Sequence, residues 1–328
     1  MLPAIENETR EVHVGMRRLL GRFAGLVLAT GVLAAPAALA APSYSGLYVF
    51  GDSLSDNGNL YALTGGAIPP APYWNGRFSD GPVAVEVLAQ GLGLGSGAFH
   101  DFAIGGAKTG SASAIDMGPQ LATYIAALGG ASADADALYV VWGGANDLRG
   151  GGASALLPAV QNLADIVGAL YAAGARHFLL PNMPDLGLTP EGLTSGNALG
   201  ATALSEAFNG VLAGAYAALA GALDDEQFFF FDAMALQRAI VGDPSAFGFS
   251  NVSAGCLTSP GCSADEFLYW DSIHPTAAAH AILGAAMLAA VPEPQTLLLA
   301  MLAVALMLRI TTHRSGGAAT REGLPAAA

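Results

Sequence analysis

The chain of 328 residues is 53% hydrophobic and only 12% charged, which is enough apolar material for one large domain or two small ones. Its net charge is −14 at pH 7, and the stretch 41–290 alone carries −16, from 5 Lys+Arg and 21 Asp+Glu. This charge balance excludes proteins that bind nucleic acid or anionic membrane surfaces through basic patches.

The N-terminal segment has the pattern of a signal peptide. Three arginines in 17–22 precede an apolar run, which closes with the small-x-small site Ala38-Leu39-Ala40. We therefore expect residues 1–40 to be a signal peptide, with Met16 as a candidate true start. The mature protein is then expected in the periplasm, on the cell surface or outside the cell. The alternative is a membrane anchor, for which the apolar run is short.

Short apolar runs alternate with longer helical stretches along the body of the chain. The candidate strands are 47–50, 98–102, 138–142, 177–180 and 228–231. The candidate helices are 83–91, 118–128, 155–173, 198–223 and 276–290. This alternation predicts an α/β fold with a parallel sheet of about five strands, covered on both faces by helices. One domain, 41–290, accounts for the whole body.

A serine stands where the first candidate strand ends. Gly51 allows a sharp turn there, and Ser53 follows it at the carboxyl edge of the predicted sheet, where functional loops of parallel sheets gather. A serine hydroxyl is a weak nucleophile and needs a base to remove its proton. The position therefore suggests a nucleophile that is activated by a partner elsewhere in the chain.

The best candidate for that base is His274. Asp271 lies three residues before it, close enough for the carboxylate to orient the imidazole on one turn. The three histidines at 100, 177 and 280 have no carboxylate at that spacing and are expected to be structural. The alternative for Asp271 and His274 is a helix cap and a surface histidine.

Acyl transfer at such a serine also needs donors for the developing oxyanion. The turn after the second candidate strand contains Gly106, whose backbone N–H no side chain blocks. The turn after the third contains Asn146, whose amide can point into the same edge. The alternative is that both are ordinary turns, because Gly-Gly and Asn-Asp pairs are common there.

These motifs together resemble the GDSL, or SGNH, hydrolase family of esterases and lipases. The matching positions, in the family's order, are Gly51-Asp52-Ser53-Leu54, Gly106, Gly144-Ala145-Asn146-Asp147 and Asp271-Ser272-Ile273-His274. The stretch 76–89 is similar to a further family segment, with Asp80 where asparagine is usual. The resemblance spans essentially residues 47–288 and implies a three-layer α/β/α sandwich with a flavodoxin-like parallel sheet.

The resemblance also implies a role for each matching side chain. Ser53 is the nucleophile and, through its backbone N–H, an oxyanion donor together with Gly106 and Asn146. His274 is the general base and Asp271 its orienting partner. The family implies neither a metal nor an organic cofactor, and the sequence contains no Walker A motif and no His/Cys cluster of the kind that binds zinc.

The chain has two cysteines, Cys256 and Cys262. Two cysteines so close together in an exported protein favour a disulfide, with two free thiols as the alternative.

The C-terminal segment resembles the PEP-CTERM sorting signal of exported bacterial proteins. It has the motif Pro292-Glu293-Pro294, an apolar run over 297–308 and then Arg309. We expect residues 291–328 to be a sorting segment and tail that is recognised by sorting machinery. Any membrane anchoring by this segment is expected to be transient. The alternative is an ordinary hydrophobic anchor or a buried helix.

The function expected from these patterns is an exported serine esterase or lipase with an ester substrate: a lipid, a short-chain ester or an acetylated polysaccharide. The PEP-CTERM resemblance slightly favours a surface polysaccharide. One alternative is acyl transfer to an alcohol by the same residues. A second, from a different class, is a non-catalytic surface module that binds through the same fold.

Overall fold

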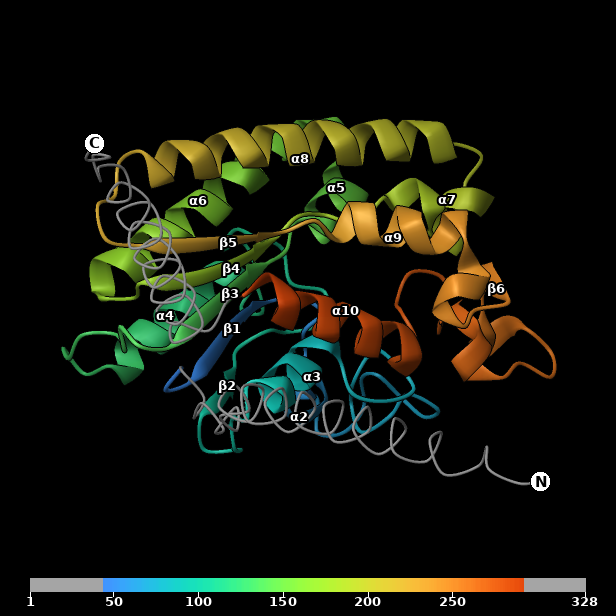
Figure 1. The fold of residues 1–328 in the computed structure, drawn as a ribbon, viewed down its shortest axis with the longest axis horizontal. Coiled ribbons are helices and arrows are strands. Elements are labelled where there is room, and N and C mark those ends of the chain that lie inside the picture. The colour runs from blue at the N-terminus through green and yellow to red at the C-terminus, as the bar shows by residue number, and fades with distance from the viewer. Residues whose placement is uncertain (1–43, 292–328) are drawn as a thin grey trace, which may run out of the picture. The chain divides into compact units, whose positions relative to one another are not determined.

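The computed structural model describes residues 44–291, at whose centre lies a five-stranded parallel sheet (Figure 1). The strands are β1 (Leu47–Gly51), β2 (Phe99–Asp101), β3 (Leu138–Trp142), β4 (His177–Pro181) and β5 (Gln227–Phe231). Their order is β2-β1-β3-β4-β5, and every neighbouring pair is parallel. This flavodoxin-like order confirms the predicted fold class. The expected signal peptide (1–40) and sorting segment (291–328) lie outside the described residues, apart from Val291.

Alternate residues of the central strands point to opposite faces of the sheet. On β3, Tyr139 and Val141 belong to one hydrophobic core, while Leu138 and Val140 belong to the other. All four side chains are fully buried. The continuous apolar sequence of this strand therefore reflects burial on both faces.

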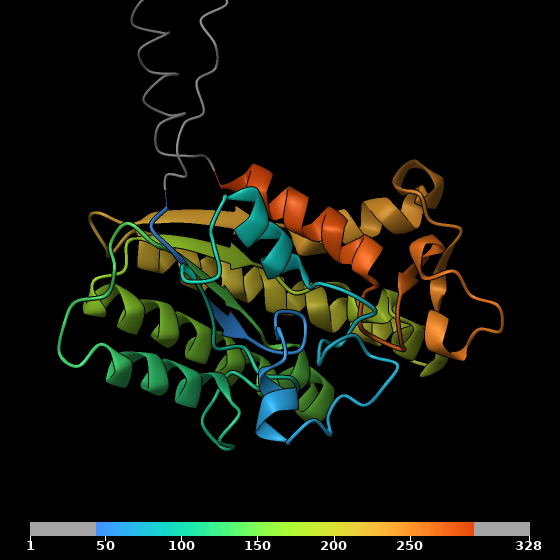
Figure 2. The ribbon, with the colours of Figure 1, turned by 90° about the horizontal axis from the view of Figure 1, so that it is seen from below.

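Different helices close the two cores (Figure 2). One face is covered by α4 (Met117–Ala127), α6 (Leu156–Ala173) and α8 (Ala198–Ala220). The other is covered by α3 (Ala84–Gly91) and α10 (Ala277–Ala290), whose buried side chains pack against β1 and β3. The domain body is thus the three-layer sandwich that the sequence predicts.

Several short elements were not expected from the sequence. They are α2 (Asn59–Leu63), α5 (Ala145–Gly151), α7 (Pro190–Thr194), α9 (Ala233–Gly242) and a second, parallel pair of strands, β6 (Asn251–Gly255) and β7 (Phe267–Tyr269). Single 3₁₀ turns occur at Gly152–Ala155, Leu186–Leu188, Pro244–Phe247, Cys256–Thr258 and Ala264–Glu266. No turn separates β5 from α9, because the Asp232 carboxylate accepts a hydrogen bond from the Ala235 N–H (2.9 Å) and caps the helix at once.

Helices α3 and α10 come from opposite ends of the domain and pack closely on each other. A Cβ atom at Gly284 would lie 2.5 Å from the Cβ of Val87, so only glycine allows this approach. One turn earlier on α10, the fully buried His280 accepts a hydrogen bond through Nδ1 from the Ala84 N–H (3.2 Å). The imidazole therefore has to stay neutral to hold the start of α3.

Folding stability should consequently depend on the protonation of His280. Burial lowers its pKa to about 3, with a smaller contribution from His274. An unfolded histidine takes up a proton near pH 6.5, so the unfolded state binds more protons between that pH and about 3, and stability falls as the pH falls through this window. Between pH 7 and pH 4 the loss from this residue is about 3 kcal/mol.

The variant His280→Gln keeps an oxygen that can accept the Ala84 N–H but has no proton to gain. We expect its free energy of unfolding, measured with urea at pH 7 and pH 4, to fall by less than that of the wild type. Equal pH slopes for the two proteins would show that His280 does not control acid sensitivity.

Candidate active site

Ser53 lies in a tight turn directly after β1. The turn is fixed at its start by Gly51, where a Cβ atom would lie 2.6 Å from the carbonyl oxygen of Trp142 on β3. Within the turn, the Asp52 carboxylate accepts a hydrogen bond from the Leu54 N–H (3.0 Å). Ser53 is 7% exposed, so its hydroxyl is held at the carboxyl edge of the sheet with little contact with water.

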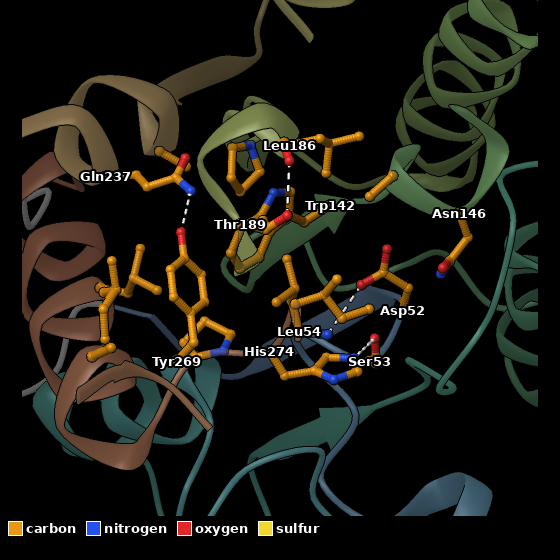
Figure 3. A pocket seen from close by; sticks show the side chains of 18 of the residues that line it. Asp52, Ser53, Leu54, Trp142, Asn146, Leu186, Thr189, Gln237, Tyr269 and His274 are labelled. Atoms are coloured by element: carbon orange, nitrogen blue, oxygen red, sulfur yellow. Dashed lines mark hydrogen bonds between the residues drawn. The ribbon is translucent and has the colours of Figure 1, made fainter. Parts of the chain in front are cut away.

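His274 lies 221 residues after Ser53 in the chain and contacts its hydroxyl (Figure 3), and on its other side it contacts Asp271. Its Nε2 lies 2.8 Å from the Ser53 Oγ, and its Nδ1 lies 2.6 Å from the Asp271 Oδ2. The other oxygen, Oδ1, accepts hydrogen bonds from the backbone N–H groups of Ile273 (2.8 Å) and His274 (2.7 Å). The structure therefore brings together the three residues that the sequence paired.

The electrostatics of the pair assign the protons. Burial acts to raise the pKa of Asp271, but the hydrogen bonds and charge of His274, with the Ile273 N–H, outweigh burial and hold that pKa at about 2. An ionised carboxylate only accepts hydrogen bonds, so Nδ1 of His274 carries the proton. In the neutral ring Nε2 is then the acceptor, and it faces the Ser53 hydroxyl as a general base requires.

A second carboxyl group sits beside the serine. Asp52 is 3% exposed, and burial raises its pKa to about 6, against smaller opposing effects of the Leu54 N–H and of His274. The hydrogen bond that its carboxylate accepts from the Leu54 N–H helps to hold Asp52 in this turn.

Sequence reasoning missed two aromatic residues at the site. Tyr73 donates a hydrogen bond from its hydroxyl to the Asp271 Oδ2 (2.7 Å), the oxygen that also receives the His274 Nδ1–H. The Phe78 ring lies 5.0 Å from the imidazole of His274, centroid to centroid. Both come from the segment before α3; the family resemblance of 76–89 includes Phe78 but not Tyr73.

The three expected oxyanion donors differ in their surroundings. Within the described residues, the backbone N–H groups of Ser53 and Gly106 donate to no protein group. Gly106 has φ +81°, a conformation that favours glycine. Asn146 uses one N–H of its amide to bind the carbonyl of Ala107 (3.0 Å), and its oxygen accepts from Arg149 (3.3 Å). Its second N–H is left for a ligand.

Ser53 and His274 open onto a cavity with an empty volume of about 810 Å³, its open mouth included. Asn146 lines the same cavity, whereas Gly106 and Asp271 are not among its lining residues.

The remaining expectations concern metals and the cysteines. In the described part of the chain, no three His, Cys, Asp or Glu side chains are placed to hold a metal ion. Cys256 and Cys262 are joined by a disulfide. The ring that it closes is tied to the catalytic segment, because the Leu257 N–H donates to the carbonyl of Trp270 (2.9 Å), the residue before Asp271.

Tyr73→Phe should lower kcat by about tenfold with little change in KM, because it removes one hydrogen bond to the Asp271 carboxylate and keeps the ring. Ester hydrolysis kinetics of the purified variant test this, with Tyr61→Phe as the matched control at a tyrosine with no side-chain hydrogen bond in the described residues. A wild-type kcat for Tyr73→Phe would show that the bond has no part in turnover.

The chain is similar to known proteins over the part that carries these residues. A family model, GDSL-like Lipase/Acylhydrolase, matches residues 47–287. A GDSL esterase/lipase of Arabidopsis thaliana is 28% identical over 317 residues, which cover 74% of this chain and 86% of the relative. A phosphatidylcholine-sterol acyltransferase of Aeromonas hydrophila is 33% identical over 170 residues, or 48% of this chain and 50% of that protein.

Among solved structures, a member of the lipolytic protein G-D-S-L family from Veillonella parvula is 13% identical, with a TM-score of 0.44, over 74% of this chain and 96% of its own. The family to which this chain belongs is shown by the match of the family model over 47–287, and not by this structural similarity. The chain belongs to the GDSL-like lipase/acylhydrolase family and is an ester hydrolase.

Proposed function

We propose that the protein is an exported serine esterase that cleaves carboxylic esters through an acyl-serine intermediate. The observation that carries this proposal is the continuous hydrogen-bonded row from Ser53 through His274 to Asp271, with bonds of 2.8 and 2.6 Å. A row in which an ionised acid orients a neutral base toward a hydroxyl is what nucleophilic catalysis by serine needs.

In the first half of the reaction, Ser53 Oγ attacks the ester carbonyl carbon while its proton passes to Nε2 of His274. The imidazolium that forms faces the ionised Asp271, which compensates its charge. The carbonyl oxygen becomes an oxyanion, for which the N–H groups of Ser53, Gly106 and Asn146 are the proposed donors. When the tetrahedral intermediate collapses, the C–O bond breaks and the leaving alcohol takes the proton from His274.

In the second half, a water molecule loses a proton to His274 Nε2 and its oxygen attacks the acyl-serine carbonyl. Collapse of this second intermediate breaks the bond to Ser53 Oγ, which regains its proton, and the carboxylic acid leaves. The proposed steps use only side chains, backbone N–H groups and water.

A second candidate is acyl transfer to an alcohol in place of water. It is favoured by one observation, the similarity of about half of this chain to the acyltransferase of Aeromonas hydrophila. The same residues serve both reactions, so the two are separated by adding an alcohol acceptor and measuring free acid against new ester. No observation favours the alternative of a non-catalytic binding module. Binding alone does not require a hydrogen-bonded row of Ser53, His274 and Asp271.

Export and sorting are proposals from the sequence. The basic and apolar pattern of residues 1–40 supports secretion, and the Pro-Glu-Pro segment within 291–328 supports handling by sorting machinery.

Ser53→Ala and His274→Ala should each lower kcat for nitrophenyl ester hydrolysis by roughly 10⁴-fold, because either change stops proton transfer from the nucleophile. Ser253→Ala, at an exposed serine, is the matched control and should retain wild-type rates. Retention of most activity in the Ser53 or His274 variant would overturn the triad.

Asn146→Ala should lower kcat by about 10²- to 10³-fold and leave KM nearly unchanged, because an oxyanion donor acts in the transition state. Asn197→Ala, at an exposed asparagine, is the control. A change in KM alone would assign Asn146 to substrate binding and not to catalysis.

A further inference from the structure

The cavity at Ser53 extends inward between α9 and α10. Its inner wall consists of residues from these helices, from β7 and from the segment that follows it: Ala233, Gln237, Ile240, Leu268, Tyr269, Ile273, Ala279 and Leu283. Several of these side chains are almost completely buried, with Leu268 4% and Ala279 1% exposed. This wall of the cavity is therefore built largely from side chains of the domain core.

The two polar side chains on this wall already have partners within the protein. The Tyr269 hydroxyl accepts a hydrogen bond from Gln237 Nε2 (2.7 Å) and donates one to the carbonyl of Leu188 (3.2 Å). The Gln237 Oε1 accepts from the Asp185 N–H (2.6 Å). A sugar hydroxyl that entered here would lose its hydrogen bonds to water and find no free partner, which is costly.

The charged side chains that line the cavity, Asp52 beside Ser53 and Arg149, lie away from this wall. Figure 3 shows Gln237 and Tyr269 on the opposite side of the cavity from Asn146. Next to Asn146 lies Arg149, whose guanidinium pairs with Glu191 (2.8 Å), and these two side chains are 35% and 43% exposed. The cavity thus has a polar, open end and an apolar end, with Ser53 between them.

We propose that the apolar end binds the acyl chain of the substrate, that this chain is a linear aliphatic chain longer than acetyl, and that Leu283 helps to set its length. This rests on the proposed function, because it assumes that the acyl group is attached to Ser53. The alcohol part of the ester then leaves through the open end, past Arg149. Each methylene group buried in this wall should raise kcat/KM about fourfold until the cavity is filled.

The test is kcat/KM for nitrophenyl esters from acetate through butyrate, hexanoate and octanoate to dodecanoate. It compares the wild type with Leu283→Trp, which fills the inner end, and Leu283→Ala, which enlarges it. Leu199→Trp is the matched control, because Leu199 is 87% exposed on α8 and does not line the cavity. Turnover of the acetate ester reports in every variant whether the fold and the triad are intact.

We expect the wild-type profile to rise with chain length and then level off. It should level off at a shorter chain in Leu283→Trp and at a longer one in Leu283→Ala, each profile being taken relative to the acetate turnover of the same variant. A profile that is flat or falls from acetate onward, with acetate turnover intact, overturns the acyl-chain assignment and leaves the esterase standing. If Leu283→Trp loses acetate turnover by misfolding, Leu283→Ala provides the test. A Leu283→Ala profile that levels off at the same chain length as the wild type then overturns the acyl-chain assignment. Absence of turnover on every ester in the wild type overturns both proposals.

Discussion

The geometry of the site depends on a set of hydrogen bonds between two segments about 200 residues apart, 73–84 and 271–280, which we call the clamp. Four bonds make it up: Tyr73 Oη to Asp271 Oδ2 (2.7 Å), Ser79 Oγ to the Pro275 carbonyl (3.0 Å), the Ala277 N–H to Asp80 Oδ1 (2.7 Å) and the Ala84 N–H to His280 Nδ1 (3.2 Å). Ser53 is fixed by the sheet, but His274 arrives near the end of the domain. The clamp gives the imidazole a defined position relative to the serine.

The sheet supplies the other half of this arrangement. The strand order reverses direction along the chain between β1 and β3, and loops at such a point diverge and leave a crevice at the carboxyl edge. Ser53 follows β1 and Asn146 follows β3, so both reach this crevice from neighbouring strands. Helices α9 and α10 then close its inner side with apolar side chains. A rigid sheet edge, a clamped histidine and an apolar wall together make the site at which we propose that esters with an aliphatic acyl chain bind.

Much of this could be predicted from the sequence, and the limits have physical causes. The parallel strands could be predicted because burial on both faces leaves continuous apolar runs such as 138–142. Ser53, Asp271 and His274 could be singled out because each stands in a local pattern. Tyr73 could not, since its contact with Asp271 joins segments with no shared pattern and arises only when α3 packs on α10. The apolar wall that we propose binds the acyl chain could not be predicted for the same reason, because its residues come from separate segments.

Asp80 illustrates the same limit. In the sequence it stands where asparagine is usual in the family, and nothing there indicates its partner. In the structure its carboxylate accepts the Ala277 N–H (2.7 Å) at the start of α10, so it takes part in the clamp.

The most direct test of the central claim, that the clamp and the sheet edge make Ser53 the nucleophile, is to map the adduct of a fluorophosphonate. The folded protein is treated with the reagent, digested, and its peptides sequenced by mass spectrometry. We expect one modified residue, Ser53, and loss of labelling after denaturation, when His274 no longer lies beside it. A folded, ester-hydrolysing protein whose adduct maps to another serine would contradict it.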